Sequence, residues 1–211
     1  MPLFPLHLVL FPGRPLPLHV FELRYREMLQ DCLAADGRFG VIAIRAGAEV
    51  GGPPEIFDVG TVAEIQQVDA LEDGRANLIT RGVQRFKVRQ LLSGKPYLRA
   101  RVTLLDETEL TEIDIQRAAC LRKLLVPYLA GLGAPAQLLE RLPNRPRDLA
   151  WLAASALQVE VAQQQHLLEL DSCSRRLEIA VEMLRRETGL MRHFGTVGSL
   201  KPPWPVGAEL N

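Results

Sequence analysis

Few residues of this chain combine the type and the spacing that catalysis requires. Ser199 and Lys201 stand two positions apart, and a lysine beside a serine is one arrangement that activates the hydroxyl as a nucleophile. Both lie in a segment rich in proline and glycine, which offers no scaffold to hold them. The sequence has no G-x-x-x-x-G-K-S/T segment and no G-x-G-x-x-G segment opening a helix, so no phosphate-binding loop is predicted. We therefore expect no catalytic residues and no enzymatic activity.

Residues that could bind a metal are equally scattered. The histidines show no H-x-x-x-H spacing, and they are His7, His19, His166 and His193. The first two could be neighbours on adjacent strands, but no third ligand is evident. The cysteines are odd in number, far apart and without a C-x-x-C pair, and they are Cys32, Cys120 and Cys173. This pattern argues against a disulfide framework or a zinc site and favours a reducing cytoplasm, so we expect no metal and no cofactor.

One block of charge could bind a partner. From Arg75 to Arg101 the chain has eight basic residues and no acidic one, whereas 46–74 has seven acidic residues and no basic one. Alternation along a strand places Phe86 and Val88 on one face and the neighbouring basic residues on the other. We therefore expect a basic stripe on one face of a sheet, made of Arg85, Lys87, Arg89, Arg99 and Arg101.

The basic stripe has two interpretations. Strands from the acidic and the basic block are neighbours in the expected hairpin, so cross-strand pairs worth about 0.2–1 kcal/mol each would neutralise much of the asymmetry. In the other interpretation the stripe binds nucleic acid, although it lacks the interleaved exposed aromatic residues that favour single-strand binding. The formal net charge is zero, so the whole protein is not expected to attract nucleic acid or anionic lipid.

The elements that must position these residues change in type near Asp106. Before it, short apolar or alternating segments bounded by turn residues predict strands, and one segment at 22–35 has the period of a helix. Strands at this spacing indicate a small closed or nearly closed barrel. We expect Gly82 to mark a turn or a bulge. The predicted strands are 3–11, 16–20, 39–44, 58–71, 76–80, 83–91 and 97–104.

The second half is helical and ends in a tail. Helices with short connections pack as a bundle, and Asp171 can cap the last of them. From Gly189 onward the prolines and glycines predict an extended or mobile segment. Trp204 in this tail either packs on its own domain or fills a groove on a neighbouring copy. The predicted helices are 113–129, 136–142, 148–158, 162–170 and one starting near 171.

Several segments, in the same order, resemble the N-terminal domain of Lon proteases. In the first half these are LFPLHLVLFPG, PLHVFELRYREML, FGVIAI, DVGTVAEI, DGRANLITRGVQRFKV and PYLRARV. In the helical half they are DLAWLAASAL and QQQHLLELDSCSRRLEIAVEML. The resemblance runs from about Leu3 to Leu184. It implies an α+β fold, in which an N-terminal PUA-like β-barrel with one inserted helix precedes a C-terminal α-helical bundle, in agreement with the pattern of elements.

The residues that carry the resemblance are expected to hold the fold. The carboxylate of Glu22 suits the positive start of a helix, and Arg24 can tie that helix to the barrel. Leu23 departs from the family, in which proline is frequent at this position. The expected domains are the barrel at 1–106, the bundle at 107–188 and the tail at 189–211. The fold-signature residues are Pro5, Phe11, Pro12, Glu22, Arg24, Tyr25, Gly60 and Phe86.

The resemblance implies a non-catalytic protein-interaction module that binds unfolded polypeptide or a specific client protein. The alternative is nucleic-acid binding through the basic residues from Arg75 to Arg101. A third possibility, an unrecognised enzyme, requires a pocket with convergent polar groups. Self-association through Trp204 is a further expectation. The apolar N-terminus lacks a basic region and a cleavage site and contains three prolines, so we expect neither a signal peptide nor a membrane span, and a cytoplasmic protein.

Overall fold

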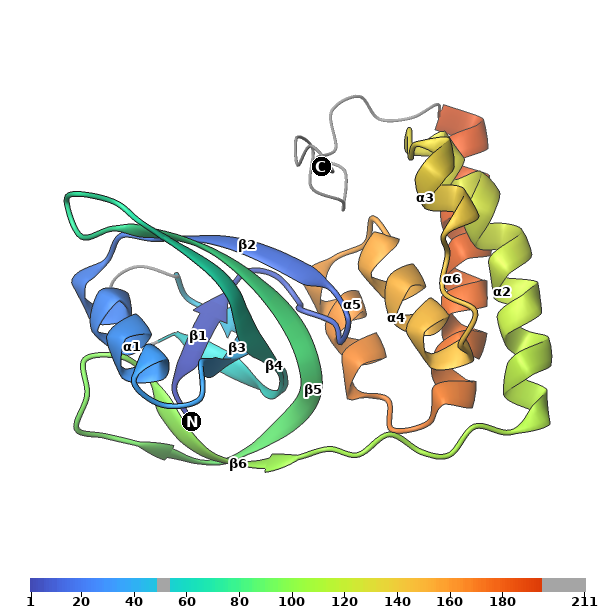
Figure 1. Cartoon of the computed structure of the whole chain (residues 1–211). Coiled ribbons are helices and arrows are strands. Elements are labelled where there is room, and N and C mark those ends of the chain that lie inside the picture. The colour runs from blue at the N-terminus through green and yellow to red at the C-terminus, as the bar shows by residue number, and fades with distance from the viewer. Residues whose placement is uncertain (49–53, 195–211) are drawn as a thin grey trace. The chain divides into compact units, whose positions relative to one another are not determined.

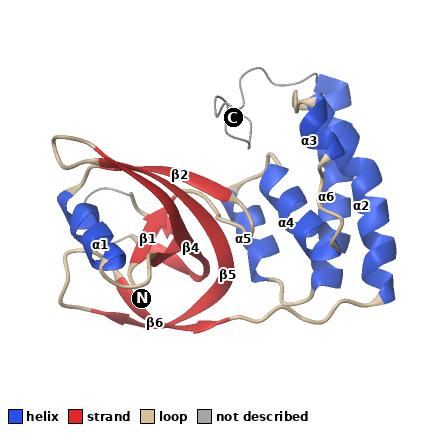
Figure 2. Ribbon diagram, in the orientation of Figure 1, coloured by secondary structure: helices blue, strands red, loops and turns tan. Residues whose placement is uncertain are grey.

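A computed structural model of the chain describes residues 1–48 and 54–194. Over these residues, strands dominate the first half and helices the second (Figure 1; Figure 2). The chain divides into two compact units, and each combines segments that are separated in sequence. We call residues 1–106 with 160–169 the sheet unit, and residues 107–159 with the chain from Leu170 the helical unit.

The sheet unit contains one mixed sheet. Its strands are β1 (Leu3–Leu6), β2 (Pro15–Val20), β3 (Arg38–Ala46), β4 (Glu55–Ala70), β5 (Ala76–Leu92) and β6 (Arg99–Leu104). The order is β1-β3-β4-β5-β2, and β6 pairs with another part of β5. The β1–β3 pair is parallel, and the other pairs are antiparallel. The long β5 pairs with three strands, because β2 pairs with its first part and β6 with its last part, while β4 pairs with much of its length.

Backbone hydrogen bonds and an isolated bridge between Pro2 and Arg99, at the starts of β1 and β6, close this sheet into a barrel. Leu3 N–H donates to the carbonyl of Leu98 at 2.8 Å, and Ala100 N–H donates to the carbonyl of Met1 at 3.0 Å. The closed ring runs β1-β3-β4-β5-β6 and returns to β1. Closure removes unpaired edges from this ring, since such edges invite aggregation, whereas β2 lies outside the ring and pairs only with β5. The predicted α+β fold, a barrel with one inserted helix followed by a helical bundle, is confirmed.

Two apolar clusters lie on the two faces of β1 and β3. Leu3 and Ile42 belong to the smaller cluster, whereas their neighbours Phe4 and Val41 belong to the larger one. This separation follows from the alternation of side chains along a strand. Helix α1 (Leu23–Leu33), which the period of the sequence predicted, packs its buried side against the larger cluster (Figure 1). Its buried side chains are Tyr25, Met28, Leu29 and Cys32.

Helix α5 (Val161–Glu169) belongs to the sheet unit, although the sequence placed it among the bundle helices. The Gln165 side chain donates to the carbonyl of Val59 in β4 at 2.9 Å. Gln165 also donates to the carboxylate of Glu169 one turn later, at 2.8 Å. A helical period predicts that a segment is helical, but it does not identify the surface against which the segment packs. The predicted domain limits at 106 and 188 do not include this return of residues 160–169 to the sheet unit.

The helical unit is built from α2 (Glu112–Gly131), α3 (Ala136–Glu140), α4 (Pro146–Ala156) and α6 (Cys173–Phe194). A capping box starts α2, in which the carboxylate of Asp114 accepts a hydrogen bond from the N–H of Thr111 at 2.8 Å. Proline at the first position of α4 is favoured there, because the missing N–H would have no partner within the helix. Helices α2, α4 and α6 contact one another pairwise and form the bundle. Leucines at helical spacing are buried in it: Leu121, Leu125, Leu149, Leu177 and Leu184.

Helix α6 starts near the predicted position and extends further than predicted. At its start, the hydroxyl of Ser172 accepts a hydrogen bond from the N–H of Arg175 at 3.3 Å. At the other end the helix continues through Gly189 to Phe194, where an extended tail was predicted. Glycine weakens a helix interior by about 1 kcal/mol, and neighbouring helix-forming residues can outweigh that cost.

Candidate interaction surface

The signature residue Phe86 is completely buried in the smaller apolar cluster, and two glycines leave the space for its ring. Gly60 lies directly opposite it on β4. A Cβ atom at Gly60 would stand 2.6 Å from the ring and 2.5 Å from the carbonyl oxygen of Val41. A Cβ atom at Gly40 would stand 2.7 Å from the same ring. These contacts give Gly60 and Phe86 a packing role and leave neither available to a ligand.

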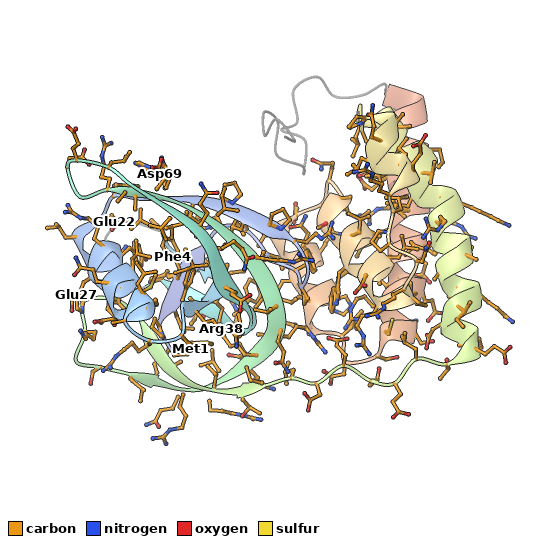
Figure 3. All side chains as sticks on the ribbon, in the orientation of Figure 1. Met1, Phe4, Glu22, Glu27, Arg38 and Asp69 are labelled. Atoms are coloured by element: carbon orange, nitrogen blue, oxygen red, sulfur yellow. The ribbon has the colours of Figure 1, made fainter. Side chains whose placement is uncertain are left out.

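Three further signature residues cluster at the start of α1. The carboxylate of Glu22 accepts a hydrogen bond from Nε of Arg24 at 2.9 Å, and no side chain caps the helix. The guanidinium of Arg24 lies 4.5 Å from the centroid of the Tyr25 ring. That ring stacks on Phe4 of β1 within the larger apolar cluster, with centroids 4.2 Å apart. Phe4 and Glu22 are labelled in Figure 3. The group therefore orients the helix on the sheet.

The segment from Phe11 to Arg14, which includes Pro12, forms a turn held against β5. Gly13 has a positive φ of 78°, and its N–H donates to the carbonyl of Gly82 at 2.8 Å. The N–H of Gly82 in turn donates a hydrogen bond to the carbonyl of Arg14 at 2.9 Å. A Cβ atom at Gly82 would collide with the Phe11 carbonyl. β5 is continuous here, with a register irregularity beside Gly82. The other early proline, Pro5, lies inside β1.

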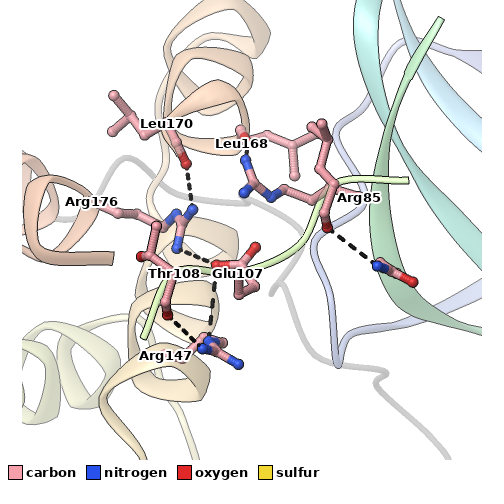
Figure 4. Close-up of polar contacts among 9 residues, drawn as sticks. Arg85, Glu107, Thr108, Arg147, Leu168, Leu170 and Arg176 are labelled. Atoms are coloured by element: carbon pink, nitrogen blue, oxygen red, sulfur yellow. Dashed lines mark hydrogen bonds and ion pairs between the residues drawn. The ribbon is translucent and has the colours of Figure 1, made fainter. Parts of the chain in front are cut away.

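Arg85 does not belong to an exposed stripe, and this part of the prediction requires correction. Its side chain is only 1% exposed, and it donates to the carbonyl of Leu168 at 2.9 Å (Figure 4). Leu168 lies in the last turn of α5, where the carbonyls carry partial negative charge that a cation stabilises. Alternation correctly predicted that the side chains of Arg85 and Phe86 point to different faces of the strand. It could not reveal that a helix distant in sequence covers Arg85.

Replacing Arg85 with methionine is expected to lower the free energy of unfolding by about 2–3 kcal/mol, because the change removes a buried charged hydrogen bond. Lys87→Met, two residues along the same face, is the matched control and should change stability by less than about 0.5 kcal/mol. Urea unfolding followed by circular dichroism measures both. Amide hydrogen exchange in α5 should also accelerate in the Arg85 variant. Equal effects of the two substitutions would contradict this role for Arg85.

The other stripe residues lie on one face of the β5–β6 pair. Lys87, Arg89 and Arg101 are exposed, and we call these three the basic face. Nε of Arg89 donates to the hydroxyl of Thr103 at 2.8 Å, and Arg101 donates to the side chain of Gln90 at 3.4 Å. Among the described residues, no carboxylate forms an ion pair with any of these three cations. The fifth stripe residue, Arg99, is half-buried and donates to the carbonyl of Ser93 at 2.6 Å.

The expected cross-strand neutralisation therefore does not reach the basic face. Three carboxylates of the acidic block instead pair with other arginines: Glu55 with Arg45, Glu64 with Arg38 and Asp73 with Arg75. Register explains the difference, because Lys87 lies opposite Val59 on β4 and opposite Thr103 on β6, neither of which is charged.

A second surface of the sheet unit was not predicted. Phe21 is 54% exposed and Leu23 is 77% exposed, at the junction between β2 and α1. The His19 ring stacks on Phe21 with centroids 5.9 Å apart, and Pro17 lies opposite the exposed Ile79. We call these five residues the apolar face. Both alternating sets of residues in this segment are largely apolar, so the sequence does not indicate which set is buried.

The group that sequence reasoning missed in the helical unit is centred on Arg176. This side chain is fully buried, with its guanidinium carbon 3.5 Å from the centroid of the Trp151 ring. It pairs with Glu107 at 3.2 Å, and Glu107 also lies 3.9 Å from Arg147 (Figure 4). Arg176 also donates to the carbonyl of Leu170. The signal was present, because an arginine within an otherwise apolar helical face is unusual unless it has buried partners.

The remaining candidates for chemistry that lie among the described residues are dispersed over the fold. Burial raises the pKa of the Cys32 and Cys173 thiols to about 11, so both stay protonated near neutral pH. Within residues 1–48 and 54–194, no three His, Cys, Asp or Glu side chains meet in a way that could hold a metal ion. None of the described helices is long and apolar enough to span a membrane. Ser199, Lys201 and Trp204 lie outside the described residues.

Comparison with known families decides the relationship that the sequence suggested. The family model described as "ATP-dependent protease La (LON) substrate-binding domain" matches residues 1–186. The chain belongs to this family. The Lon protease of Anaeromyxobacter dehalogenans is 29% identical to it over 206 residues, covering 94% of this chain and 24% of the relative. Lon protease 2 of Myxococcus xanthus is also 29% identical, covering 94% of this chain and 25% of the relative. The chain thus spans about a quarter of the length of these Lon relatives.

Solved structures of Lon N-terminal domains have the same fold. A Lon N-terminal domain protein from Xanthomonas campestris superposes with a TM-score of 0.64 at 30% identity, covering 86% of this chain and 96% of that one. The N-terminal domain of a Mycobacterium avium complex Lon protease superposes with a TM-score of 0.69 at 22% identity, covering 87% and 97%. At that identity the second likeness shows the fold alone. The resemblance to Lon N-terminal domains is confirmed.

Proposed function

We propose that this chain is a non-catalytic protein-interaction module that binds unfolded polypeptide or a specific client protein. Membership of a family described as substrate-binding supports the proposal. The observation that carries it is the apolar face, where Phe21 and Leu23 stand largely in solvent. Aromatic and aliphatic side chains gathered in this way mark interaction surfaces, since water is displaced from them on binding. A cytoplasmic location is part of the proposal, and all three cysteines are free thiols.

Side-chain contact is a better mode of binding for the apolar face than strand addition. β2 pairs with β5, but two of its six residues are Pro15 and Pro17. Prolines in a sheet are confined to edge strands, with the missing N–H on the open side. A client strand added along β2 would therefore lack two donors. The client is instead expected to place its apolar side chains against Phe21, Leu23 and Ile79.

Replacing Phe21 and Leu23 together with serine is expected to weaken the binding of a reduced and alkylated model client about tenfold, because two exposed anchors are lost. The matched control is Ile113→Ser with Ile115→Ser, which removes two exposed apolar side chains from α2. Fluorescence anisotropy of the labelled client measures affinity, and light scattering measures suppression of aggregation. Equal affinity of the Phe21/Leu23 variant and the wild type would reject this face. A wild type that neither binds the client nor delays aggregation would reject the function.

Nucleic-acid binding, the alternative suggested by the basic residues from Arg75 to Arg101, is a weaker candidate. Burial of Arg85 removes one of the five residues of the expected stripe. Phe86 directly precedes Lys87 of the basic face. Its ring is completely buried, so it cannot stack on a base. Self-association through Trp204 rests on a segment outside the described residues and stays a prediction.

A further inference from the structure

We infer that the basic face of β5 and β6 binds acidic segments of the client polypeptide. The inference rests on the proposed function and specifies that the bound segment of the client is acidic. Lys87, Arg89 and Arg101 provide the carboxylate-binding groups. The apolar face provides contacts for a different part of the same client chain.

The geometry of the basic face suits carboxylates. Arg89 engages Thr103 through Nε, and the two terminal nitrogens of its guanidinium make no hydrogen bond within the described part of the chain. These two nitrogens form the planar fork that binds a carboxylate in a bidentate manner. Arg101 donates from one terminal nitrogen to the side-chain oxygen of Gln90 at 3.4 Å, across the strand pair, and its other terminal nitrogen makes no hydrogen bond within the described residues. The cations are therefore oriented by neutral neighbours and keep their charge available to a ligand.

The three cations lie close together on the strand pair. Lys87 and Arg89 are two residues apart on β5, and the register with β6 shifts between Val88 and Gln90. The hydrogen bond from Arg89 to Thr103, the residue opposite Lys87, keeps both cations on one face. Arg101, on the neighbouring β6, lies opposite Gln90 and adds a third cation on the same face. A segment with acidic residues at alternate positions can thus meet more than one cation.

Several other cations of the sheet unit are neutralised by carboxylates. Lys95 is paired with two carboxylates of α1, Glu27 at 2.9 Å and Asp31 at 2.7 Å. Arg38 pairs with Glu64 at 2.6 Å. Cations paired in this way contribute little to the attraction of a distant partner, whereas three unpaired cations produce a local positive field in a chain of zero net charge. Charge complementarity therefore selects an acidic partner.

The test compares short fluorescein-labelled peptides that alternate threonine with glutamate or with glutamine. The wild type should bind the glutamate peptide at least about tenfold more tightly than the glutamine peptide at low salt. The variant Lys87→Glu, Arg89→Glu and Arg101→Glu should lose this preference. The control carries the same charge change on exposed residues of the helical unit: Lys123→Glu, Arg141→Glu and Arg185→Glu. The control should bind as the wild type does, and affinity should fall towards physiological salt because exposed charges are screened.

Each outcome has a separate meaning. Equal affinity for the two peptides, or equal loss in the reversed and control variants, overturns the inference. Retained binding of the neutral apolar client by the reversed variant shows that the proposed function stands independently. Tighter binding of a labelled oligonucleotide than of the glutamate peptide, lost in the reversed variant, overturns the acidic-client inference in favour of nucleic acid. If the reversed variant does not fold, Lys87→Ala and Arg101→Ala are measured singly, and each should weaken binding about threefold.

Discussion

The variant Arg176→Ala is expected to unfold with a free energy about 3–5 kcal/mol lower than that of the wild type, the range typical of breaking a buried ion pair from one side. Arg176 has no exposed surface, and the substitution leaves Glu107 without its closest cation. Arg147, at 3.9 Å, compensates only in part. The loss of the guanidinium from the face of Trp151 removes further packing.

The neighbouring Arg175 gives a matched control for this prediction. Its side chain is exposed and pairs with Glu178 one turn away on the same helix, at 2.7 Å. Exposed pairs of this kind contribute about 0.3–0.5 kcal/mol, so Arg175→Ala should leave stability almost unchanged. Urea unfolding can be followed by the fluorescence of Trp151 in a Trp204→Phe background, in which Trp151 is the remaining tryptophan. Similar losses in the two variants would show that Arg176 contributes no more than a surface arginine.

The variant Gly60→Ala is expected to lose about 3 kcal/mol of stability, at the upper end of the usual cost of overpacking a core. The added methyl group would meet the Phe86 ring at 2.6 Å and the Val41 carbonyl oxygen at 2.5 Å. The ring can shift, but the carbonyl belongs to the β3 backbone and cannot move without disturbing the sheet. Thermal and urea unfolding both measure this loss.

Two comparisons distinguish the backbone collision from a general effect of alanine. Gly189→Ala adds a methyl group to α6 with no heavy atom within 4 Å, and it should stabilise the protein by about 0.5 kcal/mol. At Gly40 the nearest atoms belong to the side chains of Leu3 and Phe86. A double-mutant cycle with Phe86→Leu should therefore recover more of the loss at Gly40 than at Gly60. Equal recovery at the two glycines would contradict the assigned role of the Val41 carbonyl.

Much of the fold could be predicted because it depends on local pattern. Alternation along the strands and the helical period of 22–35 each reflect which side chains are buried nearby, and both predictions agree with the structure. The side on which Arg85 lies was also predictable, since neighbouring residues of a strand point in opposite directions. Its burial was not predictable, because the covering helix α5 is distant in sequence and its period does not indicate its partner.

The candidate surfaces were only partly predictable for a related reason. Lys87, Arg89 and Arg101 share a face as the alternation indicates, but their lack of carboxylate partners follows from strand register, which composition does not determine. The apolar face was missed because apolar residues occupy both sides of β2. Exposure of Phe21 and Leu23 depends on where the chain leaves the sheet to begin α1.

The assignment of α5 to the sheet unit has a consequence for the order in which the chain can fold. Residues 160–169 complete a unit whose other residues end at 106, and the segment between them belongs to the helical unit. A ribosome releasing the chain from its N-terminus exposes all six strands before the helix that buries Arg85 has been synthesised. No single cleavage point separates the two units. A truncation after 106 removes α5 and leaves the guanidinium of Arg85 without the helix that buries it, so the product is not an independent domain. The barrel can reach its final state only when synthesis has passed residue 169.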